Sequence, residues 1–334
     1  MRTTLNDNNL ATASIVDWLN RISVTCFATS YLVVLGVELS RLFWKVKLRP
    51  IVRIGFTVAG LFAHTVYMVC QGKLEIDQSG IWLSNWTAWC YAAAWLLAVA
   101  YLWFSIRKFE SVVGLFVMPS VLLLVLVGIV LGDQNSFTVS EAKTGWNWVH
   151  SLSLMFGTVS VGLGFMFGAI YLVQTKRLDQ KKIQTARFRL PSLEWLHRCG
   201  ERSLIASTIL MGLGFVSGIA INMIRRNGLE GPVIAWSSPV IWSSAILFVW
   251  LLVVVAVNFV YKPAQQGRKA AYLMVSSFLF LLLELVLVWV VGHATGEAGA
   301  ATTRSMDMPV TVQATVAQSR DGLSAIIDLH GRQR

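Results

Sequence analysis

The sequence predicts an all-α fold, a polytopic helical membrane protein with about eight transmembrane helices. Of the 334 residues, 13% are charged and 55% are hydrophobic, and the mean hydropathy is +0.62. Soluble domains contain roughly 25% charged residues, so this chain has about half of the usual charge. Apolar runs of about twenty residues recur along the chain, and each is long enough to cross a hydrocarbon core of ~30 Å.

The apolar runs divide the chain into a membrane domain, residues 21–293, and two flanking segments. Residues 1–20 are polar and lack the basic flank and short apolar core of a cleavable signal peptide, so we expect the first span to be retained. Residues 294–334 are rich in Ala, Thr, Gly and Ser, and they are expected to form a flexible tail. The predicted spans cover 21–41, 51–71, 86–106, 111–131, 146–174, 203–224, 237–261 and 270–293.

The segment before the sixth span predicts a short helix of its own. Pro191 is tolerated in the first turn of a helix, and Leu193, Trp195 and Leu196 follow it. We expect these three side chains to lie along the membrane surface. Within the fifth and sixth spans, glycines at small-xxx-small spacing predict close packing of the two helices.

Basic residues are concentrated in alternate loops. The segments 41–53, 107–108, 176–202 and 262–269 contain 18 Lys and Arg, whereas the other three connecting loops contain four, namely Lys73, Lys143, Arg225 and Arg226. The positive-inside rule places the richer loops in the cytoplasm. Both termini are then extracytoplasmic, in the inner (plasma) membrane of a bacterial-type cell. The net charge of +11 is therefore explained by topology, and membrane lipid rather than nucleic acid is the expected partner.

Two ionisable residues lie inside predicted spans. His64 follows Arg53 by 11 residues, about 16 Å along a helix axis. Glu284 follows Lys269 by 15 residues, about 22 Å. Ionisable groups in the membrane usually face the interior of a helix bundle. We expect His64 and Glu284 to hydrogen-bond each other or a ligand, with a purely structural polar contact as the alternative.

A second pair of histidines is predicted at the outer surface. His150, in the stretch TGWNWVHSLS (residues 144–153), opens the fifth span, and His293 closes the eighth. Neutral imidazole is the commonest metal ligand, and two histidines can hold a haem iron axially. Trp146 lies one helical turn before His150 on the same face. Further residues of the outer side could enclose the macrocycle or hold its propionates: Trp236, Trp242, Arg225 and Arg226.

The same outer residues also fit a simpler interpretation. Tryptophan is enriched at both membrane–water interfaces, and arginine at a helix end often extends its charged group to the surface. The residues alone therefore leave an interface belt and a haem site as alternatives.

Motifs of other function classes are absent from the sequence. It contains no Walker lysine loop, no GxSxG and no HExxH, so ATP-driven or hydrolytic activity has no support and no catalytic residue is assigned. The sequence also lacks the inverted repeat that is typical of transporters, which counts against a transporter. The four cysteines form no CxxC pair, and without CxxCH the chain is not itself a c-type cytochrome. Two alternatives remain for these residues: a disulfide between two of Cys26, Cys70 and Cys90, or buried thiols.

Three stretches resemble the CcsA/ResC/CcmC-type cytochrome c assembly proteins, including their HemX-like branch. WVHSLSLMFGTVSVGLGFMFGAIYLVQTKRLDQKK is similar to the histidine-bearing span of that family, and RLPSLEWLHRCGERSLIASTILMGLGFVSGIA to its cytoplasmic elbow and next span. AHTVYMV resembles the second span of the CcsA and HemX-like branches. The resemblance covers most of residues 50–293 and is best over 146–260.

The resemblance implies haem handling in cytochrome c maturation. Haem would be bound at the outer face by His150 and His293, with His64 as an intramembrane counterpart, and delivered to apocytochrome c with a ResB-like assembly partner. One departure concerns the tryptophan-rich loop, which in the family ends in Asp-Pro. Here it is IAWSSPVIW, with Ser238 before Pro239. The missing acid favours the alternative, a HemX-like regulator of haem biosynthesis without haem-attachment activity.

Overall fold

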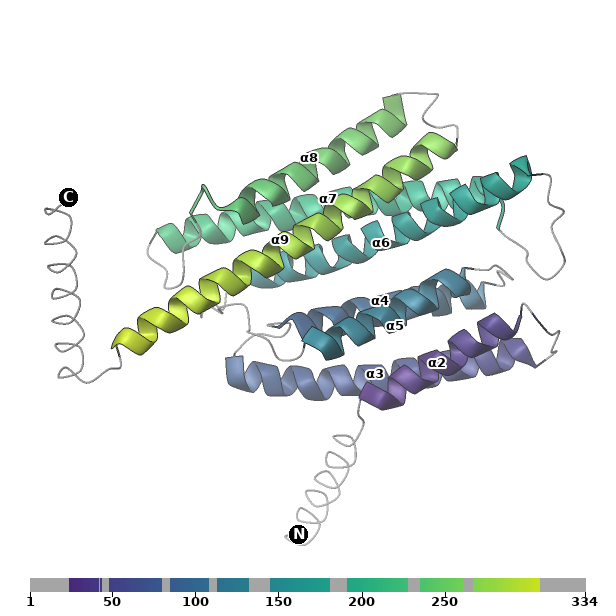
Figure 1. Cartoon of the computed structure of the whole chain (residues 1–334), viewed down its shortest axis with the longest axis horizontal. Coiled ribbons are helices and arrows are strands. Elements are labelled where there is room, and N and C mark those ends of the chain that lie inside the picture. Colours follow the sequence, from purple (N-terminus) through teal and green to yellow (C-terminus); the bar gives the residue numbers. More distant parts are fainter. Residues whose placement is uncertain are drawn as a thin grey trace, which may run out of the picture. The chain divides into compact units, whose positions relative to one another are not determined.

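The computed structural model describes residues 24–41, 43, 48–79, 85–107, 113–131, 145–180, 191–227, 235–260 and 267–306. These residues form helices and turns without any strand, which confirms the predicted all-α class. With the labels of Figure 1, the helices of the described residues are α2 (Val24–Ser40), α3 (Arg49–Ser79), α4 (Trp86–Ile106), α5 (Gly114–Leu131), α6 (Gly145–Asp179), α7 (Leu193–Arg226), α8 (Pro239–Val260) and α9 (Arg268–Met306).

Among the described residues, seven helices are long and apolar enough to cross a membrane. They correspond to the second to eighth predicted spans, so the chain is a multi-pass helical membrane protein. The first predicted span is the apolar helix α2, which has 17 residues. This length lies at the short end of the range of about 17–25 residues for a transmembrane helix. The predicted flanking segment 1–20 lies outside the described residues.

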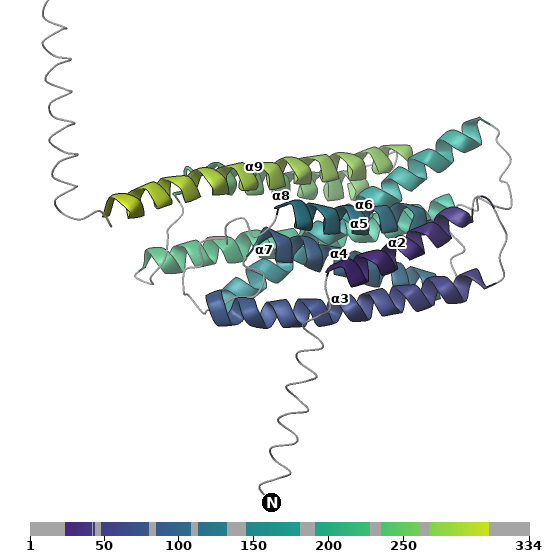
Figure 2. The same cartoon turned by 60° about the horizontal axis from the view of Figure 1, so that its bottom comes forward.

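Helices α2, α3, α4 and α5 form a four-helix arrangement, here called the first bundle (Figures 1 and 2). Helix α2 contacts α3 and α5, and α4 contacts the same two helices. Large side chains fill its centre because each helix presents an apolar stripe to the others. Those with almost no exposed surface are Phe27, Tyr31, Tyr101 and Met118.

Helices α6, α7 and α8 and residues 268–285 of α9 form the second bundle. Helix α6 packs along α7, and the glycines allow a close approach, as the small-xxx-small spacing predicted. A Cβ atom at Gly157 would lie 3.1 Å from Met211 Cγ, and one at Gly214 would lie 2.5 Å from Leu154 Cδ2. Aromatic stacking joins α9 to its neighbours, with ring centroids 4.3 Å apart for Phe165 and Phe278.

The predicted short surface helix after Pro191 is wrong as a separate element. Ser192 caps the N-terminus of α7, and the helix continues without a break over 34 residues to Arg226. Leu196 is buried rather than lying along the membrane surface. Trp195 packs edge-on against Phe104 of α4 and Phe167 of α6. This packing explains the continuity, because it buries the apolar side chains of a segment that is otherwise rich in charge.

The chain divides into two compact units, residues 1–285 and 286–334. In the second unit, the described residues 286–306 are helical and belong to α9. The helix thus extends past residue 293, where the eighth predicted span ends. The rest of the predicted tail, residues 307–334, lies outside the described part of the chain.

Candidate functional site

His150 is held against the backbone of α7. Its Nδ1 atom lies 2.7 Å from the carbonyl oxygen of Gly214. A carbonyl oxygen can only accept a hydrogen bond, so Nδ1 carries the proton and donates it. In this neutral tautomer the lone pair is on Nε2, which makes no hydrogen bond to the described residues. A ligating histidine typically has this arrangement, with one ring nitrogen fixed by a carbonyl and the other bound to the metal.

Ser217 and Gly218 complete the surroundings of the His150 ring. The Ser217 hydroxyl donates to the same Gly214 carbonyl at 2.9 Å and lies 3.4 Å from His150 Nδ1. A Cβ atom at Gly218 would lie 2.9 Å from His150 Cε1. The ring therefore occupies space that only glycine leaves open. His150 as a whole residue is partly exposed.

Aromatic and basic residues gather around this end of the second bundle. Trp146 and Trp148, in the first turn of α6, are 46% and 42% exposed. Arg225 at the end of α7 is close enough to His150 for their charges to interact. The guanidinium carbon of Arg226 lies 5.1 Å from the ring centroid of Trp236, a cation–π contact. Trp242, on the first turn of α8, is 62% exposed.

The structure thus brings part of the predicted outer set together. Arg225 lies near His150, and Arg226 lies over Trp236. His293 belongs to the helical residues of the second compact unit. Its side chain lies outside the described part of the structure, so the ligand pair His150 and His293 stays a prediction.

His64 has structural partners in the first bundle. It has no exposed surface, and its Nδ1 atom lies 3.2 Å from the Tyr31 hydroxyl. The imidazole stacks on Phe27 with a centroid separation of 4.1 Å and an interplanar angle of 1°. Tyr91 meets it edge-on. Within the described part of the chain, Nε2 of His64 is buried without a hydrogen-bond partner.

Glu284 lies in the second bundle and accepts a hydrogen bond from Ser244 of α8. The prediction that His64 and Glu284 might bond each other is therefore wrong. They belong to different bundles, and each finds a hydroxyl partner on a helix adjacent to its own. Glu284 is 9% exposed, and no cation pairs with it among the described residues.

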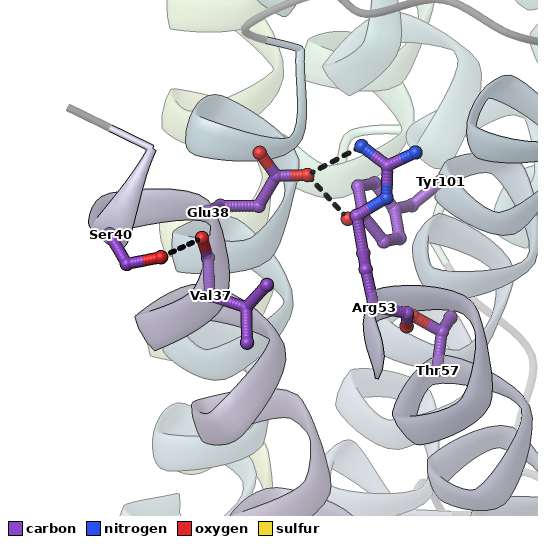
Figure 3. A network of polar contacts seen from close by, with 6 residues as sticks. All are labelled: Val37, Glu38, Ser40, Arg53, Thr57 and Tyr101. Atoms are coloured by element: carbon purple, nitrogen blue, oxygen red, sulfur yellow. Dashed lines mark hydrogen bonds and ion pairs between the residues drawn. The ribbon is translucent and has the colours of Figure 1, made fainter. Parts of the chain in front are cut away.

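A third buried polar cluster was not predicted from the sequence. Glu38 of α2 accepts hydrogen bonds from the Tyr101 hydroxyl at 2.7 Å and from Arg53 Nη1 at 3.3 Å. Figure 3 shows one oxygen of the carboxylate facing both of these side chains, which come from α4 and α3. Gly114, the first residue of α5, lies so close that a Cβ atom there would be 2.7 Å from Glu38 Oε1. All four helices of the first bundle thus meet at this carboxylate.

A signal for this cluster was present in the sequence. An acid near the end of the first predicted span and a cation near the start of the second are both costly in a membrane unless they are paired. The spacing predicted neither that the two would meet nor that Tyr101 would join them.

The described residues contain no group of three or more His, Cys, Asp or Glu side chains that could hold a metal ion by themselves. None of the four cysteines, all of which are among the described residues, forms a disulfide, and Cys26 is exposed. Of the described histidines, His150 is the one that combines a fixed tautomer with access to the surface, and it is the centre of the candidate site. Comparisons of the chain with models of protein families, with curated proteins and with solved structures found no match.

Proposed function

We propose that this membrane protein binds haem at the outer face through His150 and His293 and delivers it to apocytochrome c. The observation that carries the proposal is the hydrogen bond from His150 Nδ1 to the Gly214 carbonyl. It leaves the Nε2 lone pair on a partly exposed, uncharged imidazole, which is what a metal ligand requires. If haem is bound, His150 and His293 would hold it and haem would supply the iron that their imidazoles ligate.

The surroundings of His150 are compatible with a flat, apolar and anionic group. Trp146 lies one helical turn before His150 on the same face of α6, and it is 46% exposed. Arg225 is a cation that could hold a propionate, because its charge acts on His150. Arg–carboxylate pairs are often bidentate and strong. His64 as an intramembrane counterpart stays a prediction: its ring is enclosed by Phe27 and Tyr31, and its Nε2 atom has no hydrogen-bond partner among the described residues.

His293 as the second ligand rests on the resemblance, in which two outer histidines flank a tryptophan-rich loop. His150 opens the fifth predicted span and His293 closes the eighth.

The placement of basic loops supports an outer position for His150, with both termini extracytoplasmic in a plasma membrane. A ResB-like partner and apocytochrome c are the proposed partners in delivery. The regulator of haem biosynthesis remains the second candidate, because the loop from Ala235 to Trp242 contains no acidic residue.

The test is the visible spectrum of the protein purified in detergent, before and after addition of haem. We expect a sharp low-spin spectrum after reduction in the wild type and its loss in His150→Ala and His293→Ala. His197→Ala, a histidine substitution at the other end of α7, is the matched control and should keep the spectrum. A wild type that remains colourless and takes up no added haem would overturn the proposal.

The two candidate functions differ in what the cell loses. Haem delivery predicts that His150→Ala lowers the amount of mature cytochrome c while the haem-synthesis enzymes stay unchanged. Regulation predicts that the same variant changes the amounts of the haem-synthesis enzymes while the amount of mature cytochrome c stays unchanged. Both amounts can be measured in one strain by haem staining and by quantitative immunoblotting.

A further inference from the structure

We propose that the α7 segment Gly214–Gly218 is a positioning element that fixes the ring orientation and tautomer of His150. The inference rests on the proposed function, because it concerns how the imidazole is presented to iron. It assigns roles to Gly214 and Gly218, two of the glycines that the sequence analysis explained by helix packing alone, and to Ser217.

The first contribution is space. Gly218 lies beneath the ring, and a Cβ atom there would be 2.9 Å from Cε1 and 3.2 Å from Nδ1 of His150. Real Cβ atoms essentially never come within 3.0 Å of a neighbouring heavy atom. An alanine at this position would therefore push the imidazole off α7. The ring would then lose its hydrogen bond to Gly214, because that bond depends on contact with the helix backbone.

The second contribution is the shared carbonyl. Gly214 lies four residues before Gly218, so its carbonyl oxygen points along α7 toward the ring. This oxygen accepts from His150 Nδ1 at 2.7 Å and from the Ser217 hydroxyl at 2.9 Å. Because Gly214 lies within α7, the same oxygen also accepts the helix N–H of Gly218. Donors that share one oxygen compete for its electron density. Ser217 therefore limits how strongly Nδ1–H is polarised, and with it how basic Nε2 becomes.

Alanine at Gly218 tests the space. We expect Gly218→Ala to weaken haem binding by about 10- to 100-fold, the usual effect of losing a group that orients a metal ligand. Gly162→Ala is the matched control, because Gly162 is also a transmembrane glycine but a Cβ atom there meets nothing within 4 Å. Alanine favours helix at both positions, so a difference between the variants reports the imidazole.

A second readout needs no haem. Hydrogen–deuterium exchange at Cε1 of His150, measured by mass spectrometry, should be faster in Gly218→Ala than in the wild type or Gly162→Ala, because Cε1 loses its cover. Unchanged exchange and unchanged haem affinity in Gly218→Ala would overturn the inference. If the wild type binds no haem but exchange still rises, the proposed function fails while the positioning element stands.

Substitution of Ser217 tests the shared carbonyl. Ser217→Ala should lower the midpoint potential of the bound haem in a titration with dithionite, because a stronger Nδ1–H bond makes Nε2 a better donor and favours ferric iron. Ser217→Thr keeps the hydroxyl and should restore the wild-type potential. Ser207→Ala is the control, since Ser207 is equally buried on α7 and bonds the carbonyl of Leu204 at 2.8 Å. Equal potentials in Ser217→Ala and Ser207→Ala would contradict this role.

Discussion

The two bundles treat their buried polar groups differently. In the first bundle, the Glu38 carboxylate is matched by the cation Arg53 and the phenol Tyr101, and His64 is enclosed by Phe27 and Tyr31. In the second bundle, His150 keeps one ring nitrogen available, and Glu284 has only the Ser244 hydroxyl as its partner among the described residues.

This difference indicates a division of roles. A buried polar group whose partners are all internal stabilises one arrangement of helices and offers little to a ligand. A group that is fixed on one side and open on the other is suited to binding. We therefore propose that the first bundle is a scaffold, while the second bundle contains the candidate site. Variants in the two bundles should separate stability from haem binding.

The largest loss of stability is expected for Glu38→Gln. The substitution removes the negative charge facing Arg53, whose side chain is only 13% exposed. Removing one partner of a buried ion pair typically costs about 3–5 kcal/mol. The free energy of unfolding can be followed by circular dichroism in detergent with increasing sodium dodecyl sulfate. Glu194→Gln is the control, because the exposed pair of Glu194 and Arg198 on α7 should contribute only about 0.3–0.5 kcal/mol.

A smaller loss is expected for Tyr31→Phe. It removes the hydroxyl that meets His64 Nδ1 and leaves a buried polar atom unsatisfied, at a cost of about 1–3 kcal/mol. The haem spectrum should not change. In a double-mutant cycle, Tyr31→Phe should lower the free energy of unfolding much less in a His64→Leu background than in the wild type. Loss of the haem spectrum in His64→Leu with the fold intact would place His64 in the binding site and break the contrast between the bundles.

The smallest effect is expected for Glu284→Gln, although it is the same chemical change as Glu38→Gln. The amide oxygen can still accept from the Ser244 hydroxyl, and no cation loses its partner among the described residues. We expect a change of about 1 kcal/mol or less in the free energy of unfolding. The free energy of unfolding of Glu284→Gln, measured in sodium dodecyl sulfate in parallel with that of Glu38→Gln, checks this prediction. A loss as large as that of Glu38→Gln would reveal a charged partner for Glu284.

The sequence by itself determined the fold class and the positions of the membrane spans. Hydrophobicity over about twenty residues is a local property, and it is sufficient to place a helix in a bilayer. His64 and Glu284 could also be recognised as buried, because an ionisable residue in an apolar run must face the protein interior. The sequence did not predict that the helix after Pro191 continues without a break into the sixth span, since the packing of Trp195 on Phe104 and Phe167 joins residues far apart in the chain.

Only the tertiary structure decided which polar groups meet. Glu38 and Tyr101 are 63 residues apart, and His150 and Gly214 are 64 residues apart. Neither periodicity nor spacing specifies such pairs, because they depend on which helices are neighbours and on how each is rotated about its axis. The tautomer of His150 has the same origin. A carbonyl oxygen on α7 assigns the proton to Nδ1, and glycine at position 218 lets the ring reach that oxygen.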